Sequence, residues 1–362
     1  MKDNNRQTND KHSVKLDRCF TEIDREEWDA LLGESNSSSV FLTHGWLKSW
    51  EASYGKGADL IVLRAYVSSK LVAAVAFENR SGLVIFAGQG PSDYSDFIFL
   101  DTLEKCTAAR IMNDFLDIVC RTAKRFKHFK LGRIQVESNS FELFDHFECK
   151  YFASTSETGV APRMSMEVVE KSLRKKSLVR HERKLAKQGT LISHIYSSTV
   201  DISPLLDSFF TQHIERWENT EFPSLFLQEE ACDFYRQLVL QLEDSQCIRF
   251  MVLYLDEVPM AMHFGFVHSG RYTWYKPTFN PVYSKMSPGE VLLKRLLESA
   301  RTEAVGTFDF TIGNEAFKRR FATELPMVTH TLLTNSRFLA LMIKARQNLK
   351  SGWQWLLEYR NS

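Results

Sequence analysis

The chain has 362 residues, 44% of them hydrophobic and 25% charged, so its composition excludes a disordered or collagen-like protein and its length suits two domains. Its 46 Lys and Arg residues balance 45 Asp and Glu residues, and the formal net charge is +1. This balance argues against DNA and against a general nucleic-acid partner, because neutralising a phosphate backbone needs a dominant basic field.

The first residues, 1–14, are polar and lack the apolar core of a secretory signal, so we expect a disordered leader. No apolar run reaches the ~18 residues that a membrane-spanning helix needs. The six cysteines form no C-x-x-C pair and no zinc motif, which indicates buried, reduced thiols and no metal site. We therefore expect a cytoplasmic protein.

The first half of the chain reads as helices followed by a three-strand meander, a further strand, a long helix and a last strand. Hydrophobic periodicity and turn-forming residues place a helix start at 21–28, a helix at 41–54, strands at 60–67, 71–77, 83–87 and within 88–100, a helix at 103–127 and a strand at 133–137.

The second half repeats this order, with helices at 202–217 and 229–243, strands at 249–255, 260–268 and 271–276, a helix at 288–304 and a strand at 307–312. The repetition predicts an α/β (α+β) fold of two tandem units, each a mixed, mostly antiparallel sheet flanked by helices. We expect domains at 15–165 and 191–330, a basic linking helix at 166–190 and a C-terminal amphipathic helix at 331–362.

The linking segment is strongly basic. Residues 171–187 hold eight Lys and Arg residues and one Glu, a local charge of +7, so the rest of the chain carries −6. Such a segment is typical of a solvated helix face. It is also suited to hold a phosphate-bearing substrate or cofactor.

Ser287-Pro288-Gly289 opens the helix at 288–304. Proline suits the first helical position, and glycine allows a ligand to approach the backbone. The exposed amides and the positive dipole end of such a helix can hold a pyrophosphate, and Lys285 and Lys294 add charge. The same signal is typical of a plain helix start.

Several sequence runs carry a resemblance to a known family. YTWYKPTFNPVYSKMSPGEVLLKRLLESA at 272–300 and FDFTIGNEAFKRRFA at 308–322 resemble the CelD/BcsL-type acetyltransferases, a GNAT-superfamily group associated with bacterial polysaccharide metabolism. HIERW at 213–217 and the basic run at 173–189 extend the resemblance, and FLTHGWLKSW and GPSDYSDFIF in the first half match more loosely. The family is similar in architecture to the FemABX aminoacyltransferases, which carry two tandem GNAT-like domains.

The resemblance implies two tandem GNAT-like acyltransferase domains and acyl transfer from acetyl-CoA or another acyl-CoA to an amine or hydroxyl of a small-molecule or sugar acceptor. It also implies that strand 272–276 splays from its partner 308–312, and that the donor lies along the splayed strand and the loop 285–290. The implied donor-binding residues are Trp274, Tyr275, Lys285, Met286, Ser287, Gly289 and Glu290. The loop departs from the usual Q/R-x-x-G-x-G/A pattern, since it has only Gly289.

Four residues are candidates for catalysis. Asp309 points away from the face filled by its aromatic neighbours, so it is suited to orient the acceptor or act as a base, and equally to cap the next helix. His263 has small neighbours that leave room for a ligand, and it reads as a base or as a core histidine. Lys318 is placed to stabilise an oxyanion or to stay exposed. Phe317 stands where family members often have Tyr, which leaves Tyr275 or solvent as the acid.

Five residues are candidates for acceptor binding. His213 and Arg216 lie three apart on a helix and share a face, and Arg216 is suited to grip an acidic acceptor. Asp93, Tyr94 and Asp96 form a polar loop that reads as a sugar or amine site or as a surface turn. The tail at 338–359 suits packing on the second domain or peripheral membrane contact.

The main hypothesis is therefore a GNAT-type N- or O-acetyltransferase, with the acyl donor on the second domain. One alternative is a FemABX-like enzyme that takes its aminoacyl group from tRNA, which the single loop glycine and the basic segment favour. The other is a non-catalytic scaffold in polysaccharide biosynthesis, which Phe317 and the sparse loop favour. The acceptor and the oligomeric state are not encoded in these motifs.

Overall fold

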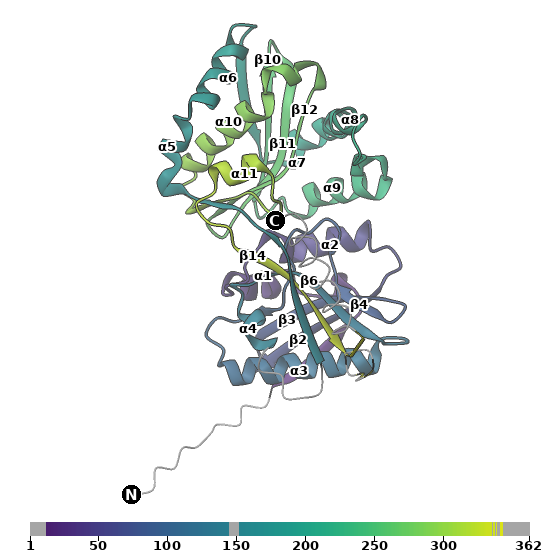
Figure 1. The fold of residues 1–362 in the computed structure, drawn as a ribbon. Coiled ribbons are helices and arrows are strands. Elements are labelled where there is room, and N and C mark those ends of the chain that lie inside the picture. The colour runs from purple at the N-terminus through teal and green to yellow at the C-terminus, as the bar shows by residue number, and fades with distance from the viewer. Residues whose placement is uncertain (1–11, 145–151, 335, 337, 339–340, 343–362) are drawn as a thin grey trace, which may run out of the picture. The chain divides into compact units, whose positions relative to one another are not determined.

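The structure is a computed structural model that describes residues 12–144, 152–334, 336, 338 and 341–342. The chain divides into two compact units (Figure 1). Of the described residues, those before 39, those from 57 to 158 and those from 329 onward form unit 1, and residues 39–56 and 159–328 form unit 2. Each unit has a mixed sheet flanked by helices, as the repeated order of elements predicts.

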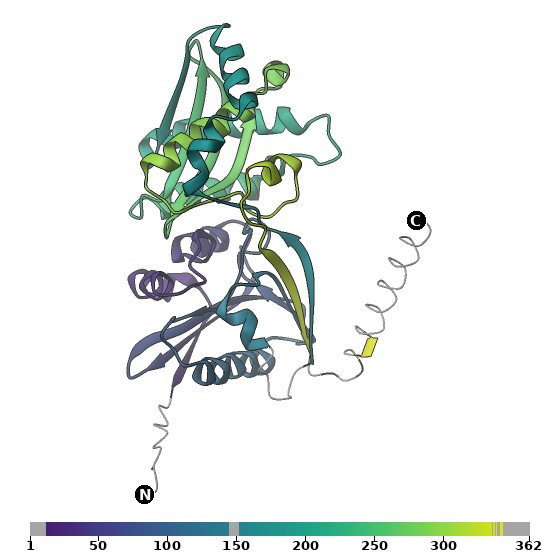
Figure 2. The ribbon, with the colours of Figure 1, turned by 60° about the vertical axis from the view of Figure 1, so that its left-hand side comes forward.

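Unit 1 is built on a sheet whose described strands follow the order β1-β2-β3-β4-β6-β14-β7, with β5 paired to β3. Strand β6 joins β4 in parallel after the long helix α3, whereas β1 to β4 pair antiparallel. Figure 2 shows β14 beside β7, although the two are far apart in sequence. The elements are β1 (Ser13–Asp17), α1 (Arg25–Gly33), β2 (Asp59–Val67), β3 (Lys70–Arg80), β4 (Leu83–Phe86), β5 (Ile98–Phe99), α3 (Lys105–Thr122), β6 (His128–Gln135), α4 (Asn139–Leu143), β7 (Phe152–Val160) and β14 (Met327–Thr334).

Unit 2 repeats this plan, and its described strands follow the order β8-β13-β12-β11-β10-β9. Strands β10, β11 and β12 form the antiparallel meander, and β13 joins β12 in parallel after the helix α10. The elements are β8 (Arg163–Ser165), α5 (Val169–Leu173), α6 (Lys176–Ala186), β9 (Leu191–Tyr196), α7 (Thr199–Ile202), α8 (Leu206–Trp217), α9 (Glu229–Gln241), β10 (Ile248–Leu255), β11 (Val258–His268), β12 (Arg271–Phe279), α10 (Pro288–Thr302), β13 (Thr307–Asp309) and α11 (Ala316–Phe321).

Tight turns explain the meanders of both units. The pairs Ser68-Ser69 and Ser81-Gly82 in unit 1, and Asp256-Glu257 and Ser269-Gly270 in unit 2, all have positive φ at both positions. That conformation matches the twist of two antiparallel strands and is typical of two-residue hairpins. The short connections fix which strands become neighbours.

Helices cover both faces of the unit 2 sheet. Helices α6 and α10 lie on one side, and α8 and α9 lie on the other (Figure 1). On the first side Trp274 joins a core cluster with the leucines of α10. On the second side the Tyr275 ring packs against Phe266 and Tyr235, with ring centres 5.6 and 6.1 Å apart. Neighbouring residues of β12 therefore face opposite helical layers.

Part of the second layer comes from the N-terminal half of the chain. Helix α2 (His44–Ala52) begins at Thr43, whose hydroxyl accepts from the N–H of Trp46 at 3.2 Å. The Trp46 ring lies 5.1 Å from Phe234 of α9 and 5.6 Å from Tyr275. A Cβ on Gly45 would lie 2.8 Å from the Gln241 carbonyl oxygen, so glycine is what allows α2 and α9 to approach so closely.

The observed organisation differs from the expected one in five respects. Strand β1 begins at Ser13, inside the expected leader. Residues 39–56 belong to unit 2, and the expected linking helix is part of unit 2, where α6 packs on α10. Cys106 is exposed on the first turn of α3, so the cysteines are not all buried. Most of the expected tail helix lies outside the described residues, and 331–334 belong to β14.

The described part of the chain has neither a membrane-spanning helix nor a metal-binding cluster. No helix there has the length and apolar character needed to cross a bilayer. No group of three or more His, Cys, Asp and Glu side chains there is arranged to hold a metal ion.

Candidate active site on the second unit

Strand β12 separates from β13 part-way along its length. On one side β12 pairs with β11 from Arg271 to Phe279, but on the other side only Arg271–Thr273 pair with β13. Strand β13 ends at Asp309 because Thr311 has a φ of 57° and Gly313 a φ of 149°, which turn the chain away. Thr311 Oγ1 donates to the Trp274 carbonyl at 3.3 Å. Beyond that point no described strand covers this edge of β12, so its backbone can pair with an extended ligand.

A bulge and a buried histidine shape β12 where the separation begins. The pairing of β11 with β12 shifts register between Phe264 and Phe266. At this shift the Tyr275 N–H donates to His263 Nε2 at 3.1 Å, so an imidazole takes the place of a strand carbonyl. His263 Nδ1 is buried and has no hydrogen-bond partner among the described residues. Burial lowers the pKa of His263 to about 3, so the ring is neutral.

The space above Gly265 is filled by the His263 ring itself. A Cβ on Gly265 would lie 2.0 Å from His263 Cε1. His263 is fully buried, and its ring centre is 5.0 Å from that of Trp274. The small neighbours that suggested room for a ligand thus make room for the imidazole, and the expected role as an acceptor base does not fit this placement.

The loop after β12 and the start of α10 bring the expected phosphate-binding residues together. Ser287 has a left-handed φ of 57°, and Pro288 and Gly289 occupy the first helical turn. The Ser287 side chain does not cap helix α10, so the first amides of the helix carry the positive end of its dipole. Lys285 is exposed beside them, and Met286 packs on the core. This is the geometry that binds anions at helix N-termini.

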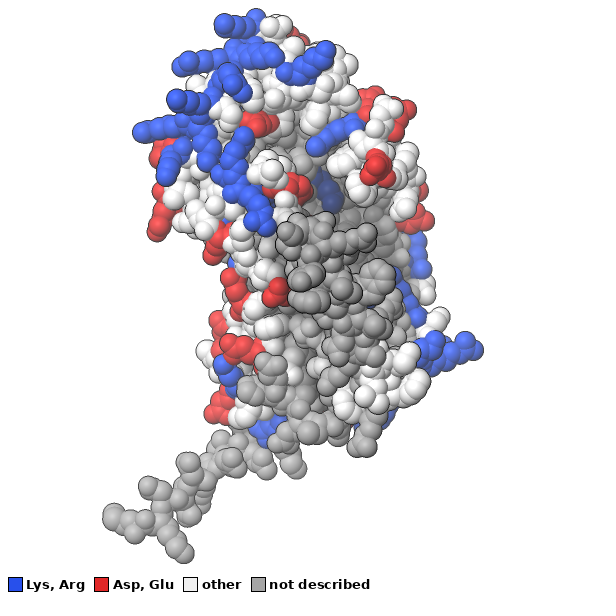
Figure 3. Space-filling view, in the orientation of Figure 1, with Lys and Arg blue, Asp and Glu red and all other residues white. Residues whose placement is uncertain are grey.

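Basic residues surround that helix start. Lys184 of α6 donates to the Lys285 carbonyl at 3.0 Å, and Lys175 donates to the Arg320 carbonyl at 3.0 Å. Glu290 is engaged by His181 at 3.0 Å and by Arg320 at 2.9 Å. Figure 3 shows Lys and Arg atoms gathered over the part of unit 2 where α5 and α6 lie in Figure 1. The basic segment therefore faces the start of α10.

The other expected catalytic residues are held by the protein itself. Asp309 is buried, with Oδ2 3.7 Å from Arg163 Nε and 3.6 Å from Arg271 Nη1, and Oδ1 accepts from the Thr311 N–H at 2.8 Å. It therefore ties β13 to β8 and β12 and does not face an acceptor. Lys318 is also buried, and its Nζ donates to the Ile312 carbonyl at 2.9 Å.

Two aromatic residues expected near the reacting groups pack in the core or against it. The Tyr275 ring packs against Phe41 and Trp46, which places it away from solvent and makes it a poor general acid. Phe317 packs against Trp274, with ring centres 6.0 Å apart, and the Lys318 ammonium pairs with Glu315 at 3.3 Å.

His213 and Arg216 lie together on the α8 side of β12. The His213 Nδ1 and Ser224 Oγ are 2.8 Å apart, and burial followed by the Lys276 and Arg216 charges lowers the pKa of His213 to about 3. Arg216 Nη1 donates to the Pro277 carbonyl at 2.8 Å. The expected pairing of these residues on one helix face is thus seen in the structure.

The expected first-half residues are inside unit 1. Tyr94 and Asp96 are buried, and only Asp93 is partly exposed. Asp96 accepts hydrogen bonds from Ser37, Ser140 and the Phe97 N–H, and burial raises its pKa to about 6. This loop is a satisfied interior turn of unit 1, so the structure does not present Tyr94 or Asp96 to an acceptor.

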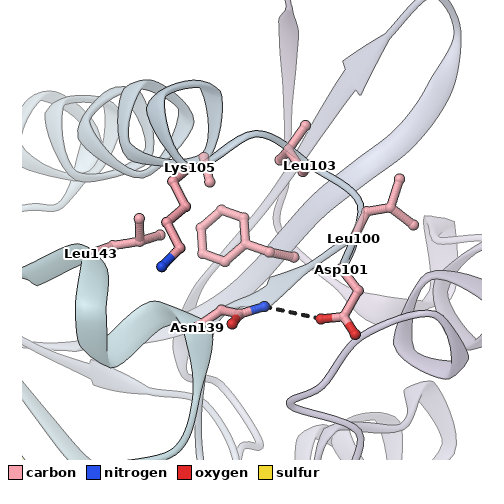
Figure 4. Close-up of a pocket in the computed structure, with 8 residues that line it drawn as sticks. Leu100, Asp101, Leu103, Lys105, Asn139 and Leu143 are labelled. Atoms are coloured by element: carbon pink, nitrogen blue, oxygen red, sulfur yellow. Dashed lines mark hydrogen bonds between the residues drawn. The ribbon is translucent and has the colours of Figure 1, made fainter.

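Unit 1 also contains a small pocket of about 90 Å³ (Figure 4). Phe99, Leu100 and Leu143 line it, and at its rim Asn139 donates to Asp101 at 3.0 Å. None of the expected site residues lines this pocket.

The comparisons with known proteins agree with this geometry. Residues 172–319 match the family model described as an acetyltransferase (GNAT) domain, which covers β9 to β13 and both α6 and α10. These residues are thus similar to a GNAT acetyltransferase domain, and the chain is an acyltransferase enzyme. No curated protein sequence matches the chain at a significant level.

Solved structures share the two-unit fold. FemX superposes with a TM-score of 0.62 at 9% identity over 88% of this chain and 96% of that chain. L-PGS from Bacillus licheniformis has a TM-score of 0.56 at 12% identity over 90% and 96%. A tandem GNAT protein from the clavulanic acid biosynthesis pathway has a TM-score of 0.50 at 8% identity over 88% and 98%. At these identities the likeness shows the tandem GNAT-like fold.

Sequence reasoning missed several residues that shape this candidate site. Two of them are Gly265, which admits the His263 ring, and Thr311, which ends β13. Two others are His181 and Arg320, whose side chains pair with Glu290. Gly265 was visible as a glycine inside a strand pattern, a signal of a bulge or close approach. The contacts of Glu290 join distant segments and leave no local signal.

Proposed function

We propose that the chain transfers an acetyl or other acyl group from acyl-CoA to an amine or hydroxyl of a small-molecule or sugar acceptor. The observation that carries this proposal is the convergence of three features in unit 2. These are the open edge of β12, the uncapped start of α10 and the basic face of α6. Together they suit a ligand with a long amide-bearing arm and a phosphate end.

The residues present fit such a donor. The Gly289 amide, with Lys285, Met286 and Ser287, would hold the phosphates, and Lys184 adds charge from α6. The Glu290 N–H already donates to the Ser287 carbonyl at 3.1 Å. The backbone groups of β12 beyond Thr273 that the protein leaves unpaired would pair with the arm of the donor, whereas the Trp274 and Pro277 carbonyls are already bonded to Thr311 and Arg216. An acyl-CoA supplies an activated thioester, and the chain supplies its position.

The buried placement of His263, Asp309 and Tyr275 shapes the proposed mechanism. His263 shapes the β12 bulge, Asp309 ties β13 to its neighbouring strands and Tyr275 packs in the core, so none is offered as the base. We propose that catalysis rests mainly on holding the donor and acceptor in line, which can supply several kcal/mol of the barrier (~7–11). The acceptor proton would pass to solvent at the open edge of β12.

The finer family assignment is part of the proposal. The motif runs at 272–300 and 308–322 support a CelD/BcsL-type acetyltransferase that acts on polysaccharide precursors in the cytoplasm. Unit 2 would carry the chemistry, and unit 1, with its satisfied interior, would carry no part of the donor site.

A second candidate is aminoacyl transfer from aminoacyl-tRNA. The exposed basic side chains of α6 and its C-cap favour it, because Arg180, Arg183, Lys184 and Lys187 would suit an extended phosphate backbone. It requires tRNA binding that weakens steeply as salt rises.

Isothermal titration separates the two candidates. Acetyl-CoA and CoA titrated into the full chain should bind, and release of the free thiol should follow when an acceptor is added. Absence of heat at millimolar acetyl-CoA, together with salt-sensitive retention of tRNA on filters, would favour the aminoacyl candidate instead.

A further inference from the structure

Arg216 carries a partly buried guanidinium that has no carboxylate partner among the described residues. Its Nη1 donates to the Pro277 carbonyl at 2.8 Å, and its Cζ lies 4.4 Å from the centre of the Phe279 ring. Burial lowers the pKa of Arg216 to about 10, and no described acid opposes that shift. The protein therefore supplies one backbone acceptor for a group with five N–H donors.

Three other arginines of the described chain with shielded side chains each lie near an acid. Arg64 pairs with Asp17 at 2.9 Å, Arg163 lies 3.7 Å from Asp309, and Arg249 pairs with Glu303 at 2.5 Å. Taking a cation out of water is unfavourable unless an anion compensates, so such pairing is expected. Arg216 lacks such an acid among the described residues, as does the partly buried Arg133, which donates to the Gly90 and Ser92 carbonyls.

The surroundings of Arg216 add donors and positive charge. Burial, followed by the charges of Lys276 and Arg216, lowers the pKa of His213, so this ring is neutral. The indole N–H of Trp217 is buried and has no acceptor among the described residues, and the Arg216 Cζ lies 5.4 Å from that ring. A guanidinium with no carboxylate partner and an indole N–H with no acceptor among the described residues, close to one another, are complementary to an anion.

The position of this cluster on the sheet distinguishes it from the donor site. Helix α8 packs on the face of β12 that carries Tyr275, whereas α10 packs with Trp274 on the other face. The two sites approach one another at Phe279, since Arg216 covers its ring and a Cβ on Gly289 would lie 3.7 Å from its Cδ1. A ligand at Arg216 would thus reach β12 from the side opposite the proposed donor phosphates.

We propose that Arg216, with Lys276 and the Trp217 indole N–H, binds an anionic group, a carboxylate or a phosphate, on the acceptor. The proposal rests on the proposed acyltransferase function and narrows its acceptor to an acid. Neutral alcohols and amines of the same shape would bind more weakly because they leave the guanidinium uncompensated.

A matched series of probes tests the proposal without any acyl donor. Glucose, glucose 6-phosphate and glucuronate share one ring and differ in charge, and ligand-observed NMR measures their binding to the full chain. We expect the two anions to bind at least about tenfold more tightly than glucose, and the better anion identifies phosphate or carboxylate as the preferred group.

Variants assign the preference to Arg216. Arg216→Gln should remove the preference for anions, and Arg216→Lys should retain part of it because the charge remains. Arg236→Gln is the matched control, because Arg236 also stacks on an aromatic ring, Phe210, but has acidic partners in Asp207 and Glu229. It should keep the preference for anions. Acetyl-CoA affinity is measured separately, because Arg216 also holds the Pro277 carbonyl of the strand proposed to pair with the donor.

The outcomes separate the two proposals. Equal binding of glucose and both anions, or an unchanged preference in Arg216→Gln, overturns the anion site. Loss of acetyl-CoA affinity in Arg216→Gln with an unchanged preference for anions also overturns it, because the cluster would then serve the donor. If the anions bind at Arg216 but acetyl-CoA does not bind the parent chain, the anion site stands and the acyl-CoA proposal fails.

Discussion

The main-chain N–H of Tyr275 donates to Nε2 of His263 over 3.1 Å, and this bond fixes the bulge at which β12 parts from β13. The ring that accepts it lies over Gly265, in space that any other residue would fill. A histidine, a glycine and a backbone amide thereby set the direction of the strand edge proposed to hold the donor.

Replacing Gly265 by Ala should destabilise unit 2 and weaken acetyl-CoA binding. The new Cβ would lie 2.0 Å from His263 Cε1, so the ring must move and its bond to Tyr275 is lost. We expect about 1–3 kcal/mol of lost stability, the usual range for overpacking, in urea unfolding followed by tryptophan fluorescence. Gly306→Ala is the control in the same unit, since its Cβ would meet nothing closer than 3.9 Å. Equal stability of the two variants would contradict this account of Gly265.

Stability should fall as the pH drops below about 6.5. His263 and His213 both have a folded pKa lowered from 6.5 to about 3, so between these values the unfolded chain binds protons that the folded chain does not. Their contribution is complete above pH 6.5 and is lost as pH falls, at up to about 1.4 kcal/mol per pH unit for each ring. His263→Gln should flatten the fall between pH 6.5 and 5 relative to the parent chain, whatever its cost at pH 7.5. A parallel fall in the two proteins would show that His263 does not carry this dependence.

Removing one cation from the basic face of α6 should weaken binding of the donor, acetyl-CoA. Lys184 reaches the Lys285 carbonyl beside the start of α10, so Lys184→Ala should reduce acetyl-CoA affinity about three- to tenfold, more at low salt than at high salt. Arg174→Ala removes the same charge from a side chain that lies near Glu170, and it should leave the affinity within about twofold. The proposal for α6 fails if the two variants bind acetyl-CoA equally.

Much of the fold follows from local pattern. The hairpins of both meanders come from short polar pairs such as Ser269-Gly270, and Pro288 and Gly289 mark the start of α10 as the sequence predicts. The exchange of residues 39–56 between the units could not be predicted. The aromatic side of α2 shows that the helix needs a core, and nothing local tells which core accepts Trp46.

The candidate site was only partly visible in the sequence. Spacing placed His213 beside Arg216, and the loop at 285–290 proved to lie at one helix start. Small neighbours of His263 indicated space, but a pattern cannot say whether a ligand or the imidazole fills it. The sequence pattern left Asp309 available to an acceptor, because its two partners, Arg163 and Arg271, are distant in sequence and only the sheet brings them to it.

The most direct test of the central claim is amide hydrogen exchange of the full chain with and without acetyl-CoA. The account predicts slower exchange in peptides that cover 274–279 and 285–292, where the donor would pair with β12 and the first amides of α10. Peptides around the unit 1 pocket at 99–108 should be unchanged. Binding of acetyl-CoA with protection confined to unit 1, or no protection at 285–292 at saturating ligand, would contradict the placement of the acyl donor on unit 2.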